Sequence, residues 1–264
     1  MPNLEISTIV GCRMKCDYCP QKLHIKTYTE KTKHTVMTLS DYAQCLAKVP
    51  TNVDIHFAGM AEPWLNENAT DMVLMAHEQG HKIQVYTTCY GMSLSDVYLM
   101  KEIPFIYFCL HLPDADGIMK IEVTKEYLEV LRACLKMHNV TFTCIGKIHP
   151  DVERITGFVE DSSRSLISRA GNIKTLAITP KKGNLVCSSM PDKMDHNVLL
   201  PNGDVLICCM DYGNRHVIGN LLEMDYESLF ESEVYKEIQE GLKNDNSKIL
   251  CRTCEIAEHS KGVV

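Results

Sequence analysis

The feature that most constrains the fold of this chain is a regular alternation of short apolar runs with amphipathic helical patterns. The apolar runs predict six strands, at residues 4–10, 53–59, 82–89, 105–112, 140–148 and 173–180. The helical patterns between them cover residues 38–49, 66–80, 93–103, 124–138 and 151–163. Because neighbouring parallel strands need crossover connections, this alternation predicts a parallel sheet and an α/β fold.

Two parallel architectures fit the alternation, an open doubly wound sheet and a curved partial barrel. Periodicity alone does not separate them. In both, ligands bind at the carboxyl ends of the strands. The first predicted strand runs directly into a cysteine-rich loop at residues 11–20, so the cysteines of this loop are expected at that face.

The pattern changes after residue 180. Residues 197–211 predict two strands around a tight turn, because Asn202–Gly203 is a strong hairpin signal. A helical pattern and two more cysteines follow the hairpin. This segment has little apolar core of its own. Such segments usually need a cross-link, such as a disulfide or a bound metal, to be stable. We therefore expect one domain over residues 1–180 and a small second domain over residues 181–264.

Composition and charge indicate which kinds of partner the protein binds and in which cellular compartment it works. The formal net charge is −7, which does not favour general binding of nucleic acid. No run of about 18 apolar residues indicates a membrane-spanning helix, and the first residues lack the basic and apolar regions of a secretory signal. We therefore expect a cytoplasmic protein, bound neither to nucleic acid nor to a membrane. Its 13 cysteines are expected to remain thiols there, and clustered thiols in such a compartment more often bind metal.

Three cysteines with the spacing Cys-x3-Cys-x2-Cys crowd the loop after the first strand: Cys12, Cys16 and Cys19. Iron–sulfur clusters are held by thiolates at such close spacings, whereas a tetrahedral zinc site would want a fourth protein ligand. Three thiolates leave one iron of a four-iron cube open to a substrate or cofactor. On spacing alone, both metals remain open.

This loop resembles the hallmark of the radical S-adenosylmethionine (radical SAM) superfamily, in which it follows the first strand of a partial barrel. Tyr18 fills the place of the aromatic residue that typically precedes the third cysteine. The resemblance implies a partial (β/α)6 TIM-like barrel, a 4Fe-4S cluster on Cys12, Cys16 and Cys19, and S-adenosyl-L-methionine bound at the open iron. It also implies that Tyr18 packs near the adenine of that cofactor.

The stretch "HFAGMAEPWLN" follows the second predicted strand and is similar to the family's Gly-Gly-Glu-Pro segment. That segment binds the methionine amino group of the cofactor. The resemblance implies that Glu62 accepts a hydrogen bond from this ammonium group. Gly59 would let the backbone approach the ligand closely.

Two later strand ends supply further cofactor-binding candidates. In "YTTCYG", Thr87 and Thr88 are expected to bond the ribose or the carboxylate of the cofactor. In "CLHLPD", His111 is a candidate, because related enzymes often place serine or histidine near the cofactor at this position. Cys109 occupies the usual serine place, which departs from the family pattern.

Four more cysteines, Cys187, Cys208, Cys251 and Cys254, flank the hairpin and end in a Cys-x2-Cys motif. By number, four thiolates suit zinc or an iron–sulfur cluster equally. The arrangement resembles the twitch domain of radical SAM proteins, a shortened SPASM domain, and implies a second, auxiliary 4Fe-4S cluster on these four cysteines. Cys209 adjoins Cys208, so either thiol could be the ligand; the spacing from the hairpin glycine favours Cys208.

The combined resemblance implies a dehydrogenase-type radical SAM oxidoreductase, similar in size and layout to 2-deoxy-scyllo-inosamine dehydrogenases. Cleavage of S-adenosyl-L-methionine would give a 5′-deoxyadenosyl radical, which takes a hydrogen atom from a substrate carbon. The auxiliary cluster would accept the second electron. The expected partners are a hydroxylated small-molecule substrate, such as a sugar or cyclitol, and an electron donor such as flavodoxin or ferredoxin. Arg169 is expected to contact the substrate or act as a base.

Three alternatives accompany this interpretation. The same radical chemistry serves enzymes that modify peptides by thioether formation, epimerisation or oxidation, although these often carry an extra domain. Epimerisation of a sugar would need a cysteine to return a hydrogen atom, and Cys109 or Cys144 are the candidates. A zinc-stabilised binding module without catalysis is the alternative from a different class.

Overall fold

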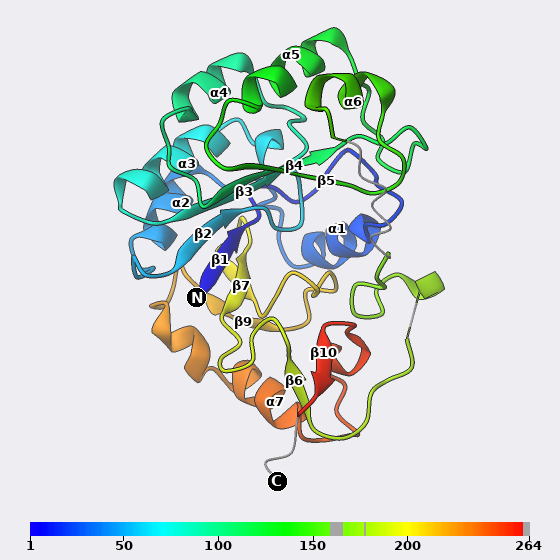
Figure 1. The fold of residues 1–264 in the computed structure, drawn as a ribbon. Coiled ribbons are helices and arrows are strands. Elements are labelled where there is room, and N and C mark those ends of the chain that lie inside the picture. Colours follow the sequence, from blue (N-terminus) through cyan, green and yellow to red (C-terminus); the bar gives the residue numbers. More distant parts are fainter. Residues whose placement is uncertain (159–165, 177, 261–264) are drawn as a thin grey trace.

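A curved, mainly parallel sheet forms the centre of the molecule (Figure 1), in a computed structural model that describes residues 1–158, 166–176 and 178–260. The eight strands follow the order β5-β4-β3-β2-β1-β7-β8-β9. The parallel strands β1 to β5 span Asn3–Ile6, Asp54–Phe57, Ile83–Thr87, Tyr107–Leu112 and Val140–Cys144. These are the first five strands predicted from the apolar runs, and the α/β fold is confirmed.

Helices connect the parallel strands and cover one side of the sheet. α2 to α6 follow one another along its outer face in Figure 1, whereas α1 lies at the opposite side, beside the strand ends. The helices α1 to α6 span Gln21–Thr29, Leu39–Leu46, Ala69–Glu78, Leu94–Met100, Lys125–Cys134 and Pro150–Thr156. In the described part of the chain, none of the helices combines the length and apolar character needed to cross a membrane.

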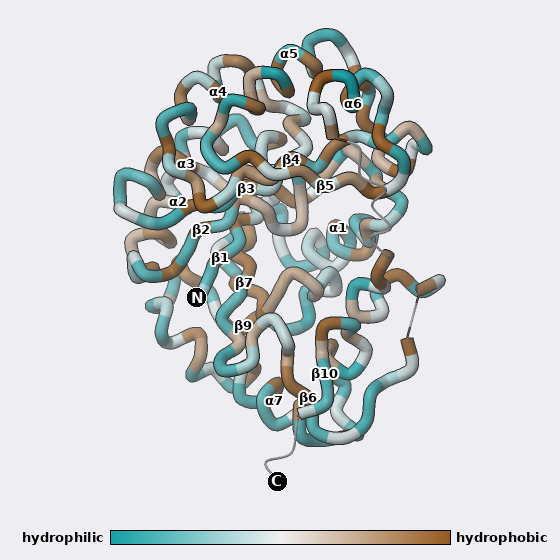
Figure 2. The backbone as a smooth tube through the Cα atoms, viewed as in Figure 1, coloured by the Kyte–Doolittle hydropathy of each residue, from teal (hydrophilic) through white to brown (hydrophobic). Residues whose placement is uncertain are grey.

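The two faces of the sheet differ in polarity because side chains alternate along each strand. On β1, Leu4 and Ile6 are fully buried in the core beneath the helices. Asn3 and Glu5, which alternate with them along the strand, line a cavity on the opposite, concave face. Figure 2 shows the hydrophobic residues gathered along the central strands. The concave face is therefore polar, as expected for a surface that binds a ligand.

The hairpin predicted at Asn202–Gly203 is present and extends the same sheet. β7 pairs with β1 in parallel, β8 returns antiparallel to it, and β9 follows; they span His196–Leu199, Asp204–Leu206 and Val217–Asn220. Gly203 has φ of +87°, and a Cβ there would lie 2.5 Å from an oxygen of Asn220. Only glycine fits this turn. The helix expected after the hairpin is α7, Glu233–Gly241. The domain division after residue 180 stays a prediction.

The sixth predicted strand, at residues 173–180, is wrong for the residues that are described there. Lys174–Leu176 form a single 3₁₀ turn with exposed side chains. The sixth parallel strand of the sheet is instead β7, which lies beside β1 at the other end of the five-strand array. The helix predicted at residues 151–163 ends earlier, at Thr156, because Gly157 follows it in a left-handed conformation. Residues 159–163 lie outside the described part.

A two-stranded sheet and a buried arginine hold the end of the chain. β6, Leu185–Cys187, pairs antiparallel with β10, Ala257–His259. The side chain of Arg252 is 3% exposed and donates to four backbone carbonyls, those of Gly183 at 2.6 Å, Gly241 at 2.8 Å, Leu242 at 2.9 Å and Lys181 at 3.2 Å. This one side chain therefore ties three segments around the last two cysteines.

Arg252→Leu is expected to lower the free energy of unfolding by about 4 kcal/mol, because several buried carbonyls would lose a charged donor. Arg132→Leu, at an exposed position of α5, is the matched control and should change it by less than about 0.5 kcal/mol. Equilibrium urea unfolding of the anaerobically purified proteins measures both. A loss below about 1 kcal/mol for Arg252→Leu would contradict the clamping role.

Candidate active site

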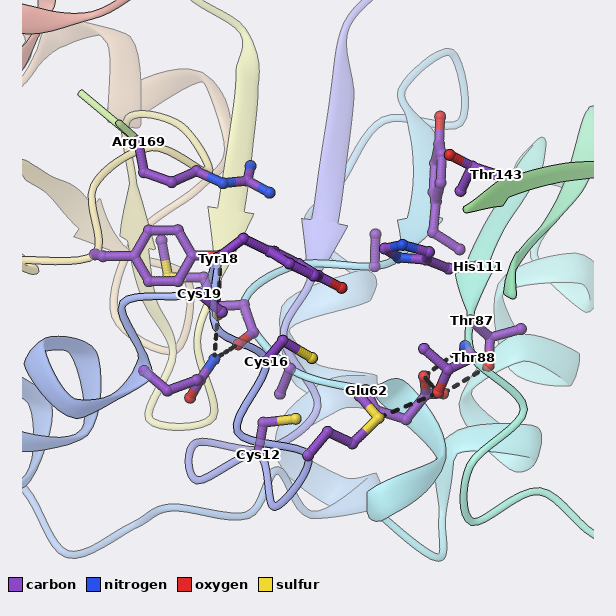
Figure 3. A pocket seen from close by; sticks show the side chains of 18 residues that line it. Cys12, Cys16, Tyr18, Cys19, Glu62, Thr87, Thr88, His111, Thr143 and Arg169 are labelled. Carbon is purple, nitrogen blue, oxygen red and sulfur yellow. Dashed lines mark hydrogen bonds between the residues drawn. The ribbon is translucent and has the colours of Figure 1, made fainter. Parts of the chain in front are cut away.

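A pocket of about 240 Å³ lies at the carboxyl ends of β1 to β4 (Figure 3). The loops that follow these strands supply most of its walls. Its lining includes Cys12, Cys16, Tyr18, Cys19, Gly59, Glu62, Thr87, Thr88, His111 and Arg169. The cysteines of the first loop, the cofactor-binding candidates and Arg169 therefore meet in one place, whereas Cys109 and Cys144, the candidate hydrogen donors, do not line it.

The cysteine loop between β1 and α1 presents three partly exposed thiols to this pocket. Burial raises the pKa of the Cys16 thiol to about 11 and also raises that of Cys12. The neighbouring thiols act in the same direction, because three negative charges so close together repel one another. A bound metal cluster would supply the positive charge that stabilises the thiolates.

Two residues that the sequence analysis missed hold Cys19. Gln21, the first residue of α1, donates from Nε2 to Cys19 Sγ at 3.5 Å and also to the Met60 carbonyl. The Cys19 thiol lies 3.8 Å from the hydroxyl of Tyr212, as donor to it. Tyr212 belongs to the segment after the hairpin. No sequence pattern near the cysteine loop therefore predicts its contact with Cys19.

Glu62 is buried across the pocket from the cysteines and is held by two threonines. Its carboxylate accepts from Thr87 Oγ1 at 2.6 Å, from Thr88 Oγ1 at 2.7 Å and from the Thr88 amide at 2.8 Å. Burial raises the pKa of Glu62, and these donors oppose the rise. A cation in the pocket would favour the ionised carboxylate. The hydroxyls of Thr87 and Thr88 thus position Glu62; their direct contact with a cofactor stays a prediction.

The turn before Glu62 brings its backbone close to β1. Gly59 has φ of +70°, and a Cβ on it would lie 3.0 Å from Ser7 Cα. Both the left-handed conformation and the close approach require glycine. The position of Gly59 in the pocket lining agrees with the expectation that backbone approaches a ligand here.

Tyr18 and His111 form an aromatic wall. Their rings stack with centroids 5.9 Å apart and an interplanar angle of 28°. Tyr18 also shares a side-chain hydrogen bond with Cys16, next to the thiols, and burial raises the pKa of its hydroxyl. A flat apolar surface with polar edges suits a planar heterocycle such as adenine.

Arg169 enters the pocket from the segment before the hairpin, on the far side from Thr87 and Thr88 in Figure 3. Its backbone has φ of +53°, an uncommon conformation for a residue with a side chain. The Asn172 side-chain amide donates to its carbonyl at 2.7 Å and holds this turn. Nearby Tyr212 contributes to raising the pKa of the guanidinium, although burial opposes it, so Arg169 remains positively charged.

A second cavity, of about 410 Å³, continues from the first along the concave face of the sheet. Five lining residues, Ala58, Gly59, Tyr86, Arg169 and Tyr212, belong to both. Glu5, His56, Gln84 and Tyr107 form a row of polar side chains in register across β1 to β4. Of this row, Glu5, His56 and Tyr107 line the cavity. The sequence analysis missed this row. The alternation of polar and apolar residues in each strand is its only local signal.

Burial perturbs this row strongly. Burial raises the pKa of Glu5 to about 7. The thiol of Cys209, the charge of Arg169 and the Gly59 amide lower this pKa, but they offset the rise only in part. Burial lowers the pKa of His56 to about 4, so this imidazole is neutral near pH 7. Among the described residues, His56 Nε2 and Gln84 Oε1 have no hydrogen-bond partner.

A third cavity, of about 210 Å³, gathers the cysteines of the second set: Cys187, Cys208, Cys251 and Cys254. The thiols are close enough to influence one another: Cys187 and Cys254 both raise the pKa of Cys251, after burial as the main cause, to about 12. Methionines 190 and 194 and Ile256 complete an apolar lining. Glu5, His196, Ser189 and Cys209 belong to this cavity and also to the second one.

The contacts of Cys208 and Cys209 distinguish the two neighbours. Among the charges that raise the pKa of Cys208 is that of Cys251, which belongs to the second set. Cys209 shares a side-chain hydrogen bond with Glu5 and lies near Arg169. Cys208 therefore groups with Cys251, whereas Cys209 faces the polar cavity.

The side chains of the two cysteine cavities are of the type that binds iron–sulfur clusters. Both cavities are lined by thiols, the usual ligands of such clusters. In the part of the chain that is described, no three His, Cys, Asp or Glu side chains converge as they would on a single metal ion. A cube binds each thiolate to a different iron, so its ligands surround a volume and do not converge on one point.

The family comparison matches residues 187–255 to SPASM, an iron–sulfur cluster-binding domain. These residues contain all four cysteines of the second set. No curated protein sequence matches the chain.

Solved structures share the fold across nearly the whole chain. BtrN in complex with AdoMet and 2-DOIA is 18% identical, with a TM-score of 0.65, and the match covers 97% of this chain and 93% of BtrN. An anSMEcpe structure with bound AdoMet is 13% identical, with a TM-score of 0.58, over 96% and 88% of the two chains. SuiB of Streptococcus suis bound to precursor peptide SuiA is 15% identical, with a TM-score of 0.53, over 96% of this chain and 69% of SuiB.

These matches confirm the resemblance on which the sequence analysis relied. The chain shares its fold with BtrN and anSMEcpe, whose structures hold bound AdoMet, and residues 187–255 match an iron–sulfur cluster-binding domain. The predicted small hairpin-plus-helix appendage is thereby also confirmed. The predicted cofactors, two 4Fe-4S clusters and S-adenosyl-L-methionine, agree with both.

Proposed function

We propose that this chain, with its radical SAM fold and SPASM segment, is an oxidoreductase that oxidises a hydroxylated small molecule, such as a sugar or cyclitol. In this proposal Cys12, Cys16 and Cys19 hold one 4Fe-4S cluster, and Cys187, Cys208, Cys251 and Cys254 hold a second. When bound and reduced, the first cluster and S-adenosyl-L-methionine supply a radical that takes a hydrogen atom from a substrate carbon. A small electron-transfer protein, such as flavodoxin or ferredoxin, provides the reducing electron.

The single observation that carries this proposal is the continuity of the three cavities. The cysteine-loop cavity shares Arg169 and Tyr212 with the polar cavity, and the polar cavity shares Glu5 and Cys209 with the second cysteine cavity. A substrate in the polar cavity would therefore lie between the radical source and an electron acceptor. That order suits a two-electron oxidation, in which one electron leaves with the hydrogen atom and one leaves separately.

The residues of the first cavity have distinct roles in this proposal. Glu62, fixed by its threonines, accepts the ammonium group of S-adenosyl-L-methionine, and Gly59 lets the backbone reach that group. Tyr18 and His111 pack against the adenine. Arg169 donates to a substrate oxygen, because a guanidinium keeps its proton at neutral pH and serves as a donor only.

Two observations favour a small molecule over a peptide. The polar cavity holds about 410 Å³, the scale of a drug-sized ligand. The chain also spans 93% of BtrN, whose structure holds AdoMet and 2-DOIA, but only 69% of the peptide-bound SuiB. Peptide modification is the second candidate, since anSMEcpe is also similar and has been crystallised with peptides.

Anaerobic incubation with S-adenosyl-L-methionine, dithionite and a panel of sugars, cyclitols and peptides tests the proposal. We expect 5′-deoxyadenosine to form and one sugar or cyclitol to lose two mass units. A mass that is unchanged in ordinary water but rises by one unit in heavy water would indicate epimerisation instead. Bound zinc, with no 5′-deoxyadenosine formed, would support the binding module and contradict the proposal.

Glu62→Gln is expected to weaken binding of S-adenosyl-L-methionine by about 100-fold, because the substitution removes the buried charge that faces the ammonium group. Glu67→Gln, five positions away and exposed, is the control and should bind normally. Anaerobic titration calorimetry on both iron-loaded proteins measures the dissociation constants. A change below about threefold for Glu62→Gln would remove Glu62 from the cofactor site.

A further inference from the structure

The polar row on the concave face carries an inference that rests on the proposed function and deepens it. Glu5 on β1 stands directly beside His56 on β2, His56 beside Gln84 on β3, and Gln84 beside Tyr107 on β4. All four side chains lie on the face opposite the apolar core. Tyr86 adds a hydroxyl 2.6 Å from that of Tyr107. The row presents donors and acceptors at close intervals, which matches the hydroxyl groups around a small ring.

Glu5 occupies a special place in this row. It lines the polar cavity and also the cavity of the second cysteine set. Of the residues that line the polar cavity, it is the only carboxylic acid. Its neighbours there are the thiol of Cys209, the guanidinium of Arg169 and the imidazole of His56. Glu5 therefore lies between the two cavities. A substrate in the polar cavity would contact Glu5 on the side from which its second electron would leave.

We propose that Glu5 is the catalytic base, which accepts the hydroxyl proton of a polyhydroxylated ring bound in the polar cavity, on the part of the row formed by Glu5, His56 and Tyr107. S-adenosyl-L-methionine, when bound, would supply the radical that takes one hydrogen atom from the substrate carbon and becomes 5′-deoxyadenosine. The hydroxyl oxygen gives its proton to the Glu5 carboxylate. An oxidised iron–sulfur cluster held by Cys187, Cys208, Cys251 and Cys254 would take up the remaining electron, so that the carbon–oxygen bond becomes a ketone.

The surroundings of Glu5 support this assignment over Arg169. Arg169 stays protonated and can only donate, so it suits the oxygen that develops negative charge. Burial of Glu5 places its pKa near 7, where a carboxylate both forms and accepts a proton readily. The imidazole of His56, which is neutral near pH 7, lines the same cavity beside Glu5.

A second imidazole lines the cavities on both sides of Glu5. His196, the first residue of β7, lines both cavities that contain Glu5. Its Nε2 lies 3.2 Å from the carbonyl of Met1, which is exposed. An imidazole between a buried carboxyl and the surface is suited to pass a proton on.

The test uses the iron-loaded full chain with three probes, myo-inositol, 2-deoxy-scyllo-inosamine and glucosamine. For the probe that the unaltered protein oxidises fastest, Glu5→Gln is expected to lower kcat by at least about 100-fold, because a positioned base contributes that much. The ratio of 5′-deoxyadenosine to ketone should rise above one, since hydrogen abstraction precedes the lost proton transfer. Glu5→Asp should recover part of kcat. Iron content confirms that each variant carries both clusters.

The outcomes separate this inference from the proposed function. If the unaltered protein makes no 5′-deoxyadenosine, the proposed function fails. If it makes 5′-deoxyadenosine but oxidises none of the three probes, the ring-binding assignment of the row is overturned. If Glu5→Gln raises only KM, or leaves the ratio of 5′-deoxyadenosine to ketone at one, Glu5 is not the base. A merely structural role for Glu5 would not change that ratio.

Discussion

Cys12→Ala should abolish cleavage of S-adenosyl-L-methionine and remove about four of about eight irons per chain. The reason is that Cys12, Cys16 and Cys19 line one cavity with Glu62, and three thiolates are the fewest that hold a cube with an open corner. Iron analysis and chromatography of 5′-deoxyadenosine, both under anaerobic conditions, measure the two losses.

Cys45→Ala is the matched control, because Cys45 is a buried cysteine of α2 in the apolar core. It should retain full iron content and full cleavage, at some cost in stability from the cavity it creates. Full cleavage by Cys12→Ala would show that the loop is not the radical source.

Cys251→Ala should separate the two proposed clusters. Because Cys251 belongs to the second cavity, the variant is expected to lose about four irons and all ketone formation, yet still cleave S-adenosyl-L-methionine. Cleavage of S-adenosyl-L-methionine by the Cys251→Ala protein would show that its barrel is folded. Iron analysis, 5′-deoxyadenosine formation and product mass are measured on the same sample.

The neighbouring pair Cys208 and Cys209 gives a sharper form of this test. Cys208→Ser should lose the same irons, whereas Cys209→Ser should keep them, because Cys251 acts on the pKa of Cys208 whereas Cys209 shares a side-chain hydrogen bond with Glu5. Equal iron loss in both variants, or loss of cofactor cleavage in Cys251→Ala, would contradict the assignment of the second cavity.

The parts of the site that the sequence predicted all sit in local motifs. The spacing of the cysteine loop and the Gly59–Glu62 stretch are fixed by a few consecutive residues, and each follows a strand directly. Because parallel strands end at one edge of the sheet, position in the chain then predicts position in space. The same logic gave Thr87, Thr88 and His111, although the threonines proved to hold Glu62.

The parts that the sequence did not predict depend on contacts between distant segments. Glu5 is one polar residue in an apolar strand, and its significance emerges only when His56 stands beside it and Cys209 reaches it from the hairpin. Tyr212 joins Cys19 across 193 positions. The apolar run at residues 173–180 resembled a strand by composition, yet the place beside β1 is filled by β7, which follows it in the chain.

The most direct test of the central claim is electron paramagnetic resonance of the reduced, anaerobically prepared protein with isotopically labelled S-adenosyl-L-methionine. We expect hyperfine coupling between the reduced cluster and the label on the methionine amino nitrogen, and its loss in Cys12→Ala. A reduced cluster whose spectrum is the same with and without S-adenosyl-L-methionine would contradict the account, as would a protein prepared without oxygen that contains no such cluster.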